Sequence, residues 1–261
     1  MQILDIIIPV YGQPELLDKC LGALPYTDVG INVIAIDDCT PKPEKSKIEE
    51  IVRDKYHLSL YRTSSNSGFG QTVNKGVSKG KAPLIMLLNT DVILNLEVVN
   101  GLIEEMKDTS VGIAAPMLIF PEKSHWGNGG KIQHVGMAFS VRGQPYHLFV
   151  GWSVDNSRAV QRRDNLSCVT GACFMTRRAL WNNAGGFQQA YGRGTFEDVE
   201  YCLVVKYVMK KLIVVNPLFR GVHYVGASSS SIDKPFDLQS NQQVFTVRMK
   251  QFVRHDEYLF W

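Results

Sequence analysis

Apolar residues along the first 115 positions follow two spacings that alternate. Continuous apolar runs at residues 3–10, 31–36, 58–61, 83–88 and 111–115 predict strands, most of them buried on both faces. Between these runs, apolar residues recur every three or four positions, which predicts helices. The predicted helices are residues 14–24, 44–55, 73–79 and 96–106.

The alternation of strand and helix, with short connections, predicts an α/β fold. Its central sheet is expected to be mostly parallel and flanked by helices on both faces. After Pro116 the alternation stops, and residues 121–165 are rich in Gly, His, Trp and Arg without a clear period. We expect this excursion, residues 121–165, to leave the sheet and to shape a pocket.

Regular structure is predicted again after the excursion. Strands or extended pieces are expected at 168–176, 212–215 and 220–224, and helices at 177–183, 197–209 and 237–254. The last helix carries apolar residues on one side and arginine and lysine on the other. We favour its packing on the domain, and contact with a membrane surface is the alternative.

Polar residues end two of the predicted strands. Asp37 and Asp38 follow the second strand, and Asn89 and Asp91 follow the fourth. Ligands of open α/β sheets bind at the carboxyl ends of strands. A buried carboxylate needs a partner, and divalent cations such as Mg²⁺ and Mn²⁺ prefer such oxygens and bridge to phosphates. A turn or cap explains the same residues, so both interpretations stay open.

Two further features carry candidate chemistry. Glu197 and Asp198 begin a predicted helix directly after a glycine-rich segment. The helix dipole alone favours acidic residues there, but a carboxylate beside a flexible loop also suits a general base. His223 lies about 25 residues after Asp198. It is a candidate metal ligand only if the fold brings it to Asp91, and it is otherwise a structural histidine.

Composition narrows the class of protein. The chain has 45% hydrophobic and 20% charged residues, which is ordinary for a globular domain. A net charge of +3 and a pI near 8.5 are too mildly basic to indicate a nucleic-acid-binding protein. Five cysteines without a CxxC pair favour a reducing compartment. With neither a signal peptide nor an apolar run of about 18 residues, we expect a cytoplasmic protein.

The motifs, taken in order, resemble the inverting GT-A glycosyltransferases of family 2, including their rhamnosyltransferase-like group. The matching stretches are 6–11 (IIIPVY), 33–38 (VIAIDD), 66–70 (NSGFG) with Asn74, 87–92 (LLNTDV), 169–173 (VTGAC), 185–187 (GGF), 196–200 (FEDVE) and 222–223 (VH). Each motif is weak alone, and the ordered set is specific. The resemblance implies one GT-A domain, with a Rossmann-like nucleotide-sugar half at about 1–115, an acceptor and catalytic half at about 116–230, and a helical tail at about 231–261.

The resemblance also implies a donor site. The donor would be a nucleoside-diphosphate sugar linked to UDP or dTDP. Backbone groups of residues 9–11 would line the base, and Asp38, with Asp37 beside it, would bind base or ribose. The expected donor-binding residues are Pro9, Val10, Tyr11, Asp37, Asp38, Asn66, Gly68, Asn74, Asn89, Thr90, Gly171 and Ala172.

Catalytic and metal-binding roles follow from the same resemblance. Asn89 and Asp91 match the family's Asp-x-Asp motif, and His223 matches a metal ligand, so Mn²⁺ or Mg²⁺ is expected at Asp91 and His223. Asp198 matches the catalytic base, and Glu197 would orient hydroxyl groups of the acceptor or sugar.

The chain departs from the family pattern after the Glu-Asp pair. Glu200 stands where many members have aspartate, and no arginine lies at the expected place after it. Arg193 and Lys206 are the candidates to supply the missing positive charge.

The predicted function is inverting sugar transfer to an acceptor hydroxyl, most simply on a polysaccharide or lipid-linked glycan. A protein or a modified nucleic-acid base is the alternative acceptor. A nucleotidyltransferase is the alternative enzyme, but residues 10–14 lack the basic glycine-rich loop that it needs. A catalytically inactive nucleotide- or sugar-binding module is the alternative without an activity. The protein is expected in the cytoplasm or at the periphery of the membrane.

Overall fold

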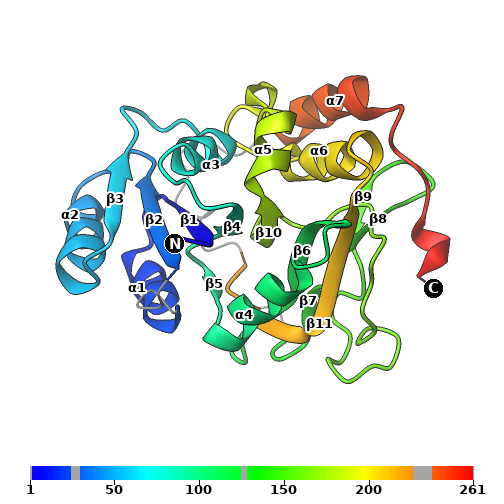
Figure 1. Ribbon diagram of the computed structural model, residues 1–261, viewed down its shortest axis with the longest axis horizontal. Helices are drawn as coiled ribbons and strands as arrows, with labels where there is room; N and C mark the ends of the chain where they lie inside the picture. The colour runs from blue at the N-terminus through cyan, green and yellow to red at the C-terminus, as the bar shows by residue number, and fades with distance from the viewer. Residues whose placement is uncertain (1, 25–29, 125–127, 226–236, 261) are drawn as a thin grey trace.

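The computed structural model describes residues 2–24, 30–124, 128–225 and 237–260. One large sheet runs through the molecule, and its strands pair in the order β3-β2-β1-β4-β10-β6-β11-β5, with β7 beside β6 (Figure 1). The strands are β1 Leu4–Val10, β2 Ile31–Asp37, β3 Ser59–Arg62, β4 Leu84–Leu88, β5 Val92–Ile93, β6 Val111–Ile119, β7 Ile132–His134, β10 Cys173–Arg177 and β11 Leu212–His223.

Most of the paired residues in the main sheet lie in parallel pairings. Strand β1 runs parallel to β2 and β4, β2 to β3, and β6 to β11, whereas β10 is antiparallel to β4 and β6. The expected α/β fold with a mostly parallel sheet is therefore confirmed. Because β1, β2 and β4 point the same way, the polar residues that follow them meet at one edge of the sheet.

Helices cover both faces of this sheet. Side chains of β1 alternate between the two faces and pack against different helices. Ile7 joins the core cluster that contains residues of α3, α5, α6 and α7, and Ile6 joins the cluster that contains residues of α1, α2 and α4. The helices are α1 Pro14–Ala23, α2 Glu44–Glu49 with η1 Glu50–Lys55, α3 Phe69–Val77, α4 Leu96–Glu105, α5 Arg178–Ala184, η2 Gln189–Tyr191, α6 Glu197–Leu203 with η3 Val204–Val208, α7 Leu238–Met249 and η5 Glu257–Leu259.

Two predictions need correction. The excursion leaves the main sheet only in part, because β7 pairs with β6, while β8 Met137–Phe139 and β9 Pro145–His147 form a small second sheet. The two extended pieces predicted at 212–215 and 220–224 are one strand, β11, whose register against β6 shifts between Asn216 and Arg220. Pro217 lies in this interruption and has no N–H for the ladder.

The tail helix α7 packs on the domain. Phe245 and Met249 are buried at 2% and 3% exposure, and Phe245 lies against the rings of Phe139 and Phe196. The favoured interpretation of this helix therefore agrees with the structure. Within the described ranges, no helix is long and apolar enough to cross a membrane.

Candidate active site

A pocket of about 410 Å³ lies at the carboxyl ends of β1 and β4. Segments that are far apart in the sequence border it, and most of the predicted site residues line it. These are Pro9, Val10, Tyr11, Asp38, Asn66, Gly68, Asn89, Thr90, Asp91, Gly171, Ala172, Glu197, Asp198 and His223. Asp37 and Asn74 are the predicted residues that do not line this pocket.

Asp37 and Asp38 take different positions although they are neighbours. The Asp37 carboxylate forms an ion pair with Arg62 and accepts a hydrogen bond from the Thr40 N–H, so it fastens the end of β2. Asp38 lines the pocket, but its two oxygens accept hydrogen bonds from Thr63 and from residues 67 and 68. Asp37 thus anchors a loop, and the Asp38 carboxylate holds the loop that borders the pocket; their contact with base or ribose stays a prediction.

Asn74 holds two distant segments together. Its side-chain oxygen accepts from the Phe187 N–H at 3.0 Å, and its Nδ2 donates to the Phe187 carbonyl at 2.8 Å. Gly186 is needed beside it, because an added Cβ at this position would lie 2.4 Å from Asn74 Oδ1. The amide of Asn74 therefore joins α3 to the turn after α5, and its contact with the donor stays a prediction.

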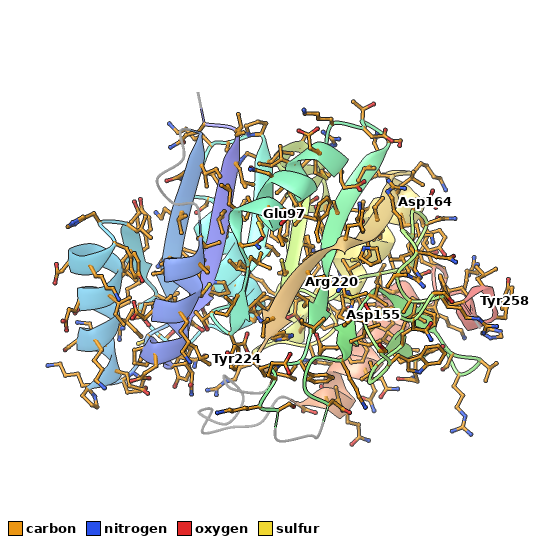
Figure 2. All side chains as sticks on the ribbon, turned by 90° about the horizontal axis from the view of Figure 1, so that it is seen from below. Glu97, Asp155, Asp164, Arg220, Tyr224 and Tyr258 are labelled. Carbon is orange, nitrogen blue, oxygen red and sulfur yellow. The ribbon has the colours of Figure 1, made fainter. Side chains whose placement is uncertain are left out.

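The segment after β4 carries two buried oxygens into the pocket. The Asn89 N–H donates to the Ala172 carbonyl, and the Asp91 carbonyl accepts from the Tyr224 N–H, so both sides of the turn are fixed. Tyr224 directly follows β11 (Figure 2). Asn89 Oδ1 is buried without a hydrogen-bond partner among the described residues. An unpaired buried oxygen costs about 1–3 kcal/mol, which a ligand or cation at the pocket would offset.

His223 meets Asp91 because β11 pairs with β5, with His223 opposite Val92. The Nε2 atom of His223 lies 3.5 Å from Asp91 Oδ1, and its Nδ1 lies 3.0 Å from Gln133 Oε1. The fold thus brings the two predicted metal ligands together. No group of three or more His, Cys, Asp or Glu side chains in the described part of the chain is arranged to hold a metal. Asp91 and His223 stay the predicted ligands for a cation, and Asn89 lines the same pocket.

Gln133 was not predicted from the sequence. It lies in β7, inside the excursion, where the sequence shows no period and no motif. Its contact with His223 depends on the pairing of β7 with β6 and of β6 with β11, which no local pattern reveals.

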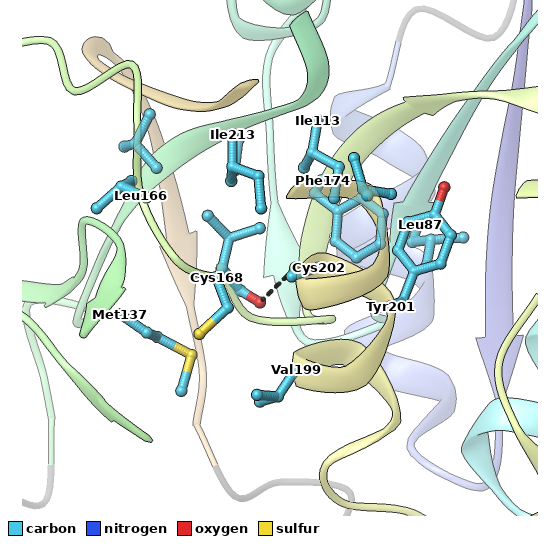
Figure 3. Packing of buried hydrophobic residues seen from close by; sticks show 14 of the residues in the cluster. Leu87, Ile113, Met137, Leu166, Cys168, Phe174, Val199, Tyr201, Cys202 and Ile213 are labelled. Atoms are coloured by element: carbon cyan, nitrogen blue, oxygen red, sulfur yellow. Dashed lines mark hydrogen bonds between the residues drawn. The ribbon is translucent and has the colours of Figure 1, made fainter. Parts of the chain in front are cut away.

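Asp198 is held at the start of α6. The Gly171 N–H donates to its Oδ2 at 2.7 Å, and the Val199 N–H donates to its Oδ1 at 2.8 Å. Burial raises the pKa of Asp198, and these N–H groups oppose the rise. Helix α6 itself is anchored in the core, where Cys202 donates to the Val169 carbonyl at 3.8 Å (Figure 3).

Glu197 lies beside Asp198 and is the less exposed of the two residues. Burial, and then the charge of Asp198, raise the pKa of Glu197 above the usual carboxyl range. Its Oε2 is buried and has no hydrogen-bond partner within the described segments. Thr195 and Phe196, just before it, have positive φ angles of 83° and 70°, a conformation that non-glycine residues rarely adopt. The backbone is therefore bent to present both carboxylates to the pocket.

The glycine-rich loop before α6 contributes Arg193 to the pocket. The Phe69 N–H donates to the Arg193 carbonyl, and an added Cβ at Gly68 would lie 2.4 Å from Arg193 Cα. Gly68 therefore permits the close approach of this loop to α3. Lys206, the other candidate cation, donates to the carbonyls of Asn165 and Leu166, away from the residues that line the pocket.

Helix α7 holds the same loop from outside. Asn241 Nδ2 lies within hydrogen-bond distance of the Tyr191 carbonyl at 2.9 Å, the Gly194 carbonyl at 2.5 Å and Thr195 Oγ1 at 3.0 Å. Arg248 pairs with Glu200 at 2.7 Å, so the glutamate that departs from the family pattern has an arginine partner from the tail. The sequence did not identify either contact, because the partners are some 50 residues apart.

Comparisons with known proteins find a family model and relatives that match this chain. The family model described as "Glycosyl transferase family 2" matches residues 5–183. An uncharacterized protein, y4gI of Sinorhizobium fredii, is 25% identical over 213 residues, which are 78% of this chain and 22% of that protein. The chain therefore spans about a fifth of the length of this curated relative.

Two solved structures share the fold. One is the mannosyltransferase PcManGT from Pyrobaculum calidifontis in complex with GDP-Man and Mn²⁺, with a TM-score of 0.59 at 12% identity. The match covers 86% of this chain and 57% of that protein's chain. The other is GalNAc-T7 with UDP, GalNAc and Mn²⁺, with a TM-score of 0.71 at 13% identity. The match covers 95% of this chain and 48% of that protein's chain. The GT-A type of fold expected from the sequence is thereby confirmed.

Proposed function

The chain belongs to glycosyl transferase family 2, and we propose that its pocket transfers a sugar from a nucleoside-diphosphate donor to an acceptor hydroxyl group. The observation that carries this proposal is the convergence of Asp91, His223 and Asp198 on one pocket from three separate segments. The two structural neighbours were solved with GDP-Man or UDP and with Mn²⁺, which supports a nucleotide-sugar donor and a divalent cation here.

Asp91 and His223 would hold the cation, Mn²⁺ or Mg²⁺. A carboxylate oxygen, an imidazole nitrogen and the buried, unpartnered Asn89 Oδ1 suit such ions, so the residues fit. A bound cation would offset the negative charge that builds on the leaving diphosphate. Water and phosphate oxygens would complete the coordination, as is common where proteins supply few ligands.

Asp198 would act as the general base. The acceptor hydroxyl gives its proton to Asp198 while its oxygen forms the bond to the anomeric carbon, and the carbon–oxygen bond to the diphosphate breaks with its electron pair. Attack from the side opposite the diphosphate inverts the configuration. Burial raises the pKa of Asp198, which makes it a stronger base than an exposed carboxylate.

Glu197 and Arg193 would position the reactants. Because its pKa is raised, Glu197 keeps a proton at neutral pH and donates a hydrogen bond to a sugar hydroxyl. Arg193 lines the pocket, and its guanidinium has no partner among the described residues. It would bind the diphosphate, in place of the arginine that the family pattern carries after α6 begins.

The donor is proposed to carry UDP or dTDP, and the acceptor to be a glycan or lipid-linked glycan at the cytoplasmic side of a membrane. A nucleotidyltransferase has less support, because residues 11–13, directly after β1, contain no lysine or arginine. An inactive binding module has less support as well, since the residues proposed as base, metal ligands and donor-binding edge all line one pocket.

Donor turnover by the Asp198→Asn variant tests the proposed reaction. Sugar release from UDP- and dTDP-linked donors is measured with Mn²⁺, in water and with glycan acceptors. We expect the variant to lose transfer by about 10²–10⁴-fold, the range of a general base, while its affinity for the nucleotide stays near that of the wild type. Transfer near the wild-type rate in the variant would reject Asp198 as the base.

A further inference from the structure

A line of buried and half-buried polar side chains leads from His223 into the excursion. Gln133 Oε1 lies 3.0 Å from His223 Nδ1, and Gln133 Nε2 lies 3.5 Å from His147 Nδ1. His147 Nδ1 lies 3.1 Å from His134 Nδ1, and His134 Nε2 lies 3.4 Å from the Thr170 nitrogen. These contacts join the ends of β7, β9 and β11 with the loop before β10.

We propose that Gln133, His147 and His134 are positioning residues that fix His223 in one tautomer, with its proton on Nδ1 and the Nε2 lone pair directed to Asp91. This inference deepens the metal site of the proposed function and rests on it. The line of contacts supplies what a metal-binding histidine needs, which is a partner for the ring nitrogen that does not bind the metal.

The position of each proton follows from one backbone group. The Thr170 N–H can only donate, so the nitrogen that faces it, His134 Nε2, accepts. His134 then carries its proton on Nδ1 and donates it to His147 Nδ1. His147 Nδ1 is then an acceptor, which favours the NH₂ group of Gln133 over its oxygen at the 3.5 Å contact between them. Gln133 Oε1 therefore faces His223, whose Nδ1 carries the hydrogen.

This deduction requires that the two inner histidines are neutral, and their surroundings make them so. His134 is fully buried, and burial, followed by the charges of His147 and His223, lowers its pKa well below the usual value. Burial lowers the pKa of His147 to about 4. At neutral pH each ring therefore has one N–H and one lone pair, as the deduced arrangement demands.

The consequence for the site is specific. With the proton on Nδ1, the Nε2 atom that lies 3.5 Å from Asp91 Oδ1 presents a lone pair to the same point as the carboxylate. Two donor atoms directed at one point suit a cation between them. The other tautomer would direct an N–H at Asp91 and block that cation. Losing an outer partner of a ligating histidine typically weakens metal affinity about 10–100-fold.

Nuclear magnetic resonance of ¹⁵N-histidine-labelled protein tests the tautomer without metal. At about pH 9, where an ordinary imidazole is neutral, we expect His223 to show a protonated Nδ1 and an unprotonated Nε2. In the Gln133→Met variant, which keeps the side-chain length but removes both polar groups, the Nε2–H form should appear. A wild-type His223 that carries its proton on Nε2 would overturn the inference, and so would an unchanged His223 spectrum in Gln133→Met.

Titration with Mn²⁺ alone, followed by electron paramagnetic resonance, tests the consequence. Gln133→Met should weaken Mn²⁺ binding about 10–100-fold, and Gln133→Glu, which still accepts from His223 Nδ1, should stay near the wild type. The control is Gln188→Met, a half-buried glutamine whose amide contacts the Ala184 carbonyl outside the pocket. Equal affinities of Gln133→Met and wild type would reject the positioning role.

The two experiments separate this inference from the proposed function. If the wild type and His223→Ala bind Mn²⁺ equally, the proposed metal site is wrong, whatever the tautomer. If His223→Ala abolishes binding but Gln133→Met does not weaken it, the metal site stands and the positioning role fails.

Discussion

The backbone N–H of Gly171 donates a 2.7 Å hydrogen bond to Oδ2 of Asp198. The loop that ends at β10 thereby fixes the direction of the carboxylate that we propose as the base. The preceding residue of the same loop, Thr170, contacts His134 through its own N–H. Consecutive N–H groups of one loop therefore contact the proposed base and the line of side chains that we propose to position His223.

The first prediction concerns Gly171→Ala. An added Cβ would lie 3.1 Å from Asp198 Cβ and 3.2 Å from Phe69 Cε1, so the carboxylate must move by a few tenths of an ångström. We expect kcat to fall about tenfold, because small displacements of a reacting group are costly. The control is Gly22→Ala on α1, which meets the Tyr56 hydroxyl at 2.9 Å and should affect stability without affecting kcat. An unchanged kcat in Gly171→Ala would show that the position of Asp198 is not critical.

The second prediction concerns Asn241→Ala. The substitution removes the contacts of α7 with residues 191–195 and should destabilise the protein by about 1–3 kcal/mol. Amide hydrogen exchange should rise in residues 191–195, and KM for the donor should rise because the loop carries Arg193. Gln243→Ala, at an exposed position of the same helix, is the control. Unchanged exchange in this loop would contradict the holding role of α7.

The third prediction concerns pH. Burial and the charge of Asp198 raise the pKa of Glu197 to about 8, above its value in the unfolded chain. The folded state then binds this proton more tightly, so the contribution of Glu197 to stability is fully present below about pH 4 and is lost as pH rises toward 8. Glu197→Gln removes this loss. The Tm of the variant relative to the wild type should therefore increase between about pH 5 and pH 9, and a constant difference would refute the raised pKa.

The fourth prediction concerns Arg193→Met. If Arg193 binds the diphosphate, calorimetry should show nucleotide affinity reduced about tenfold, the value of one charge-assisted hydrogen bond. Lys206→Met is the matched control, because Lys206 binds carbonyls of residues 165 and 166 instead of lining the pocket. Equal losses in the two variants would indicate a general effect on folding, and no loss in Arg193→Met would exclude its contact with the diphosphate.

The sequence predicted the parts of the fold that local patterns encode. Apolar runs predicted the strands of the first half. Polar residues after β2 and β4 do meet at one pocket, because parallel strands end at a common edge. The resemblance assigned residues by motif and therefore included Asp37 and Asn74. Their side chains prove to fasten the backbone around the pocket, a distinction that depends on where each side chain points.

The sequence did not predict the contacts between distant segments. Gln133 reaches His223 through two strand pairings. Asn241 reaches the loop at residues 191–195, and Arg248 reaches Glu200, because α7 folds back on the domain. Neither β7 nor α7 carries a motif that identifies the segment it packs against. The register of the sheet and the packing of the tail decide these contacts.

Metal-dependent nucleotide binding tests whether the pocket binds a nucleotide through a cation at Asp91. Calorimetric titration of UDP, dTDP and GDP, each with Mn²⁺ and with EDTA, is carried out on the wild type, on Asp91→Ala and on Asp155→Ala, an exposed aspartate of the excursion (Figure 2). We predict that one nucleotide binds only with Mn²⁺, that Asp91→Ala abolishes this binding, and that Asp155→Ala retains it. If no nucleotide binds the wild type, the proposed donor site is wrong. If Asp91→Ala shows equal metal-dependent binding, the proposed metal site is wrong.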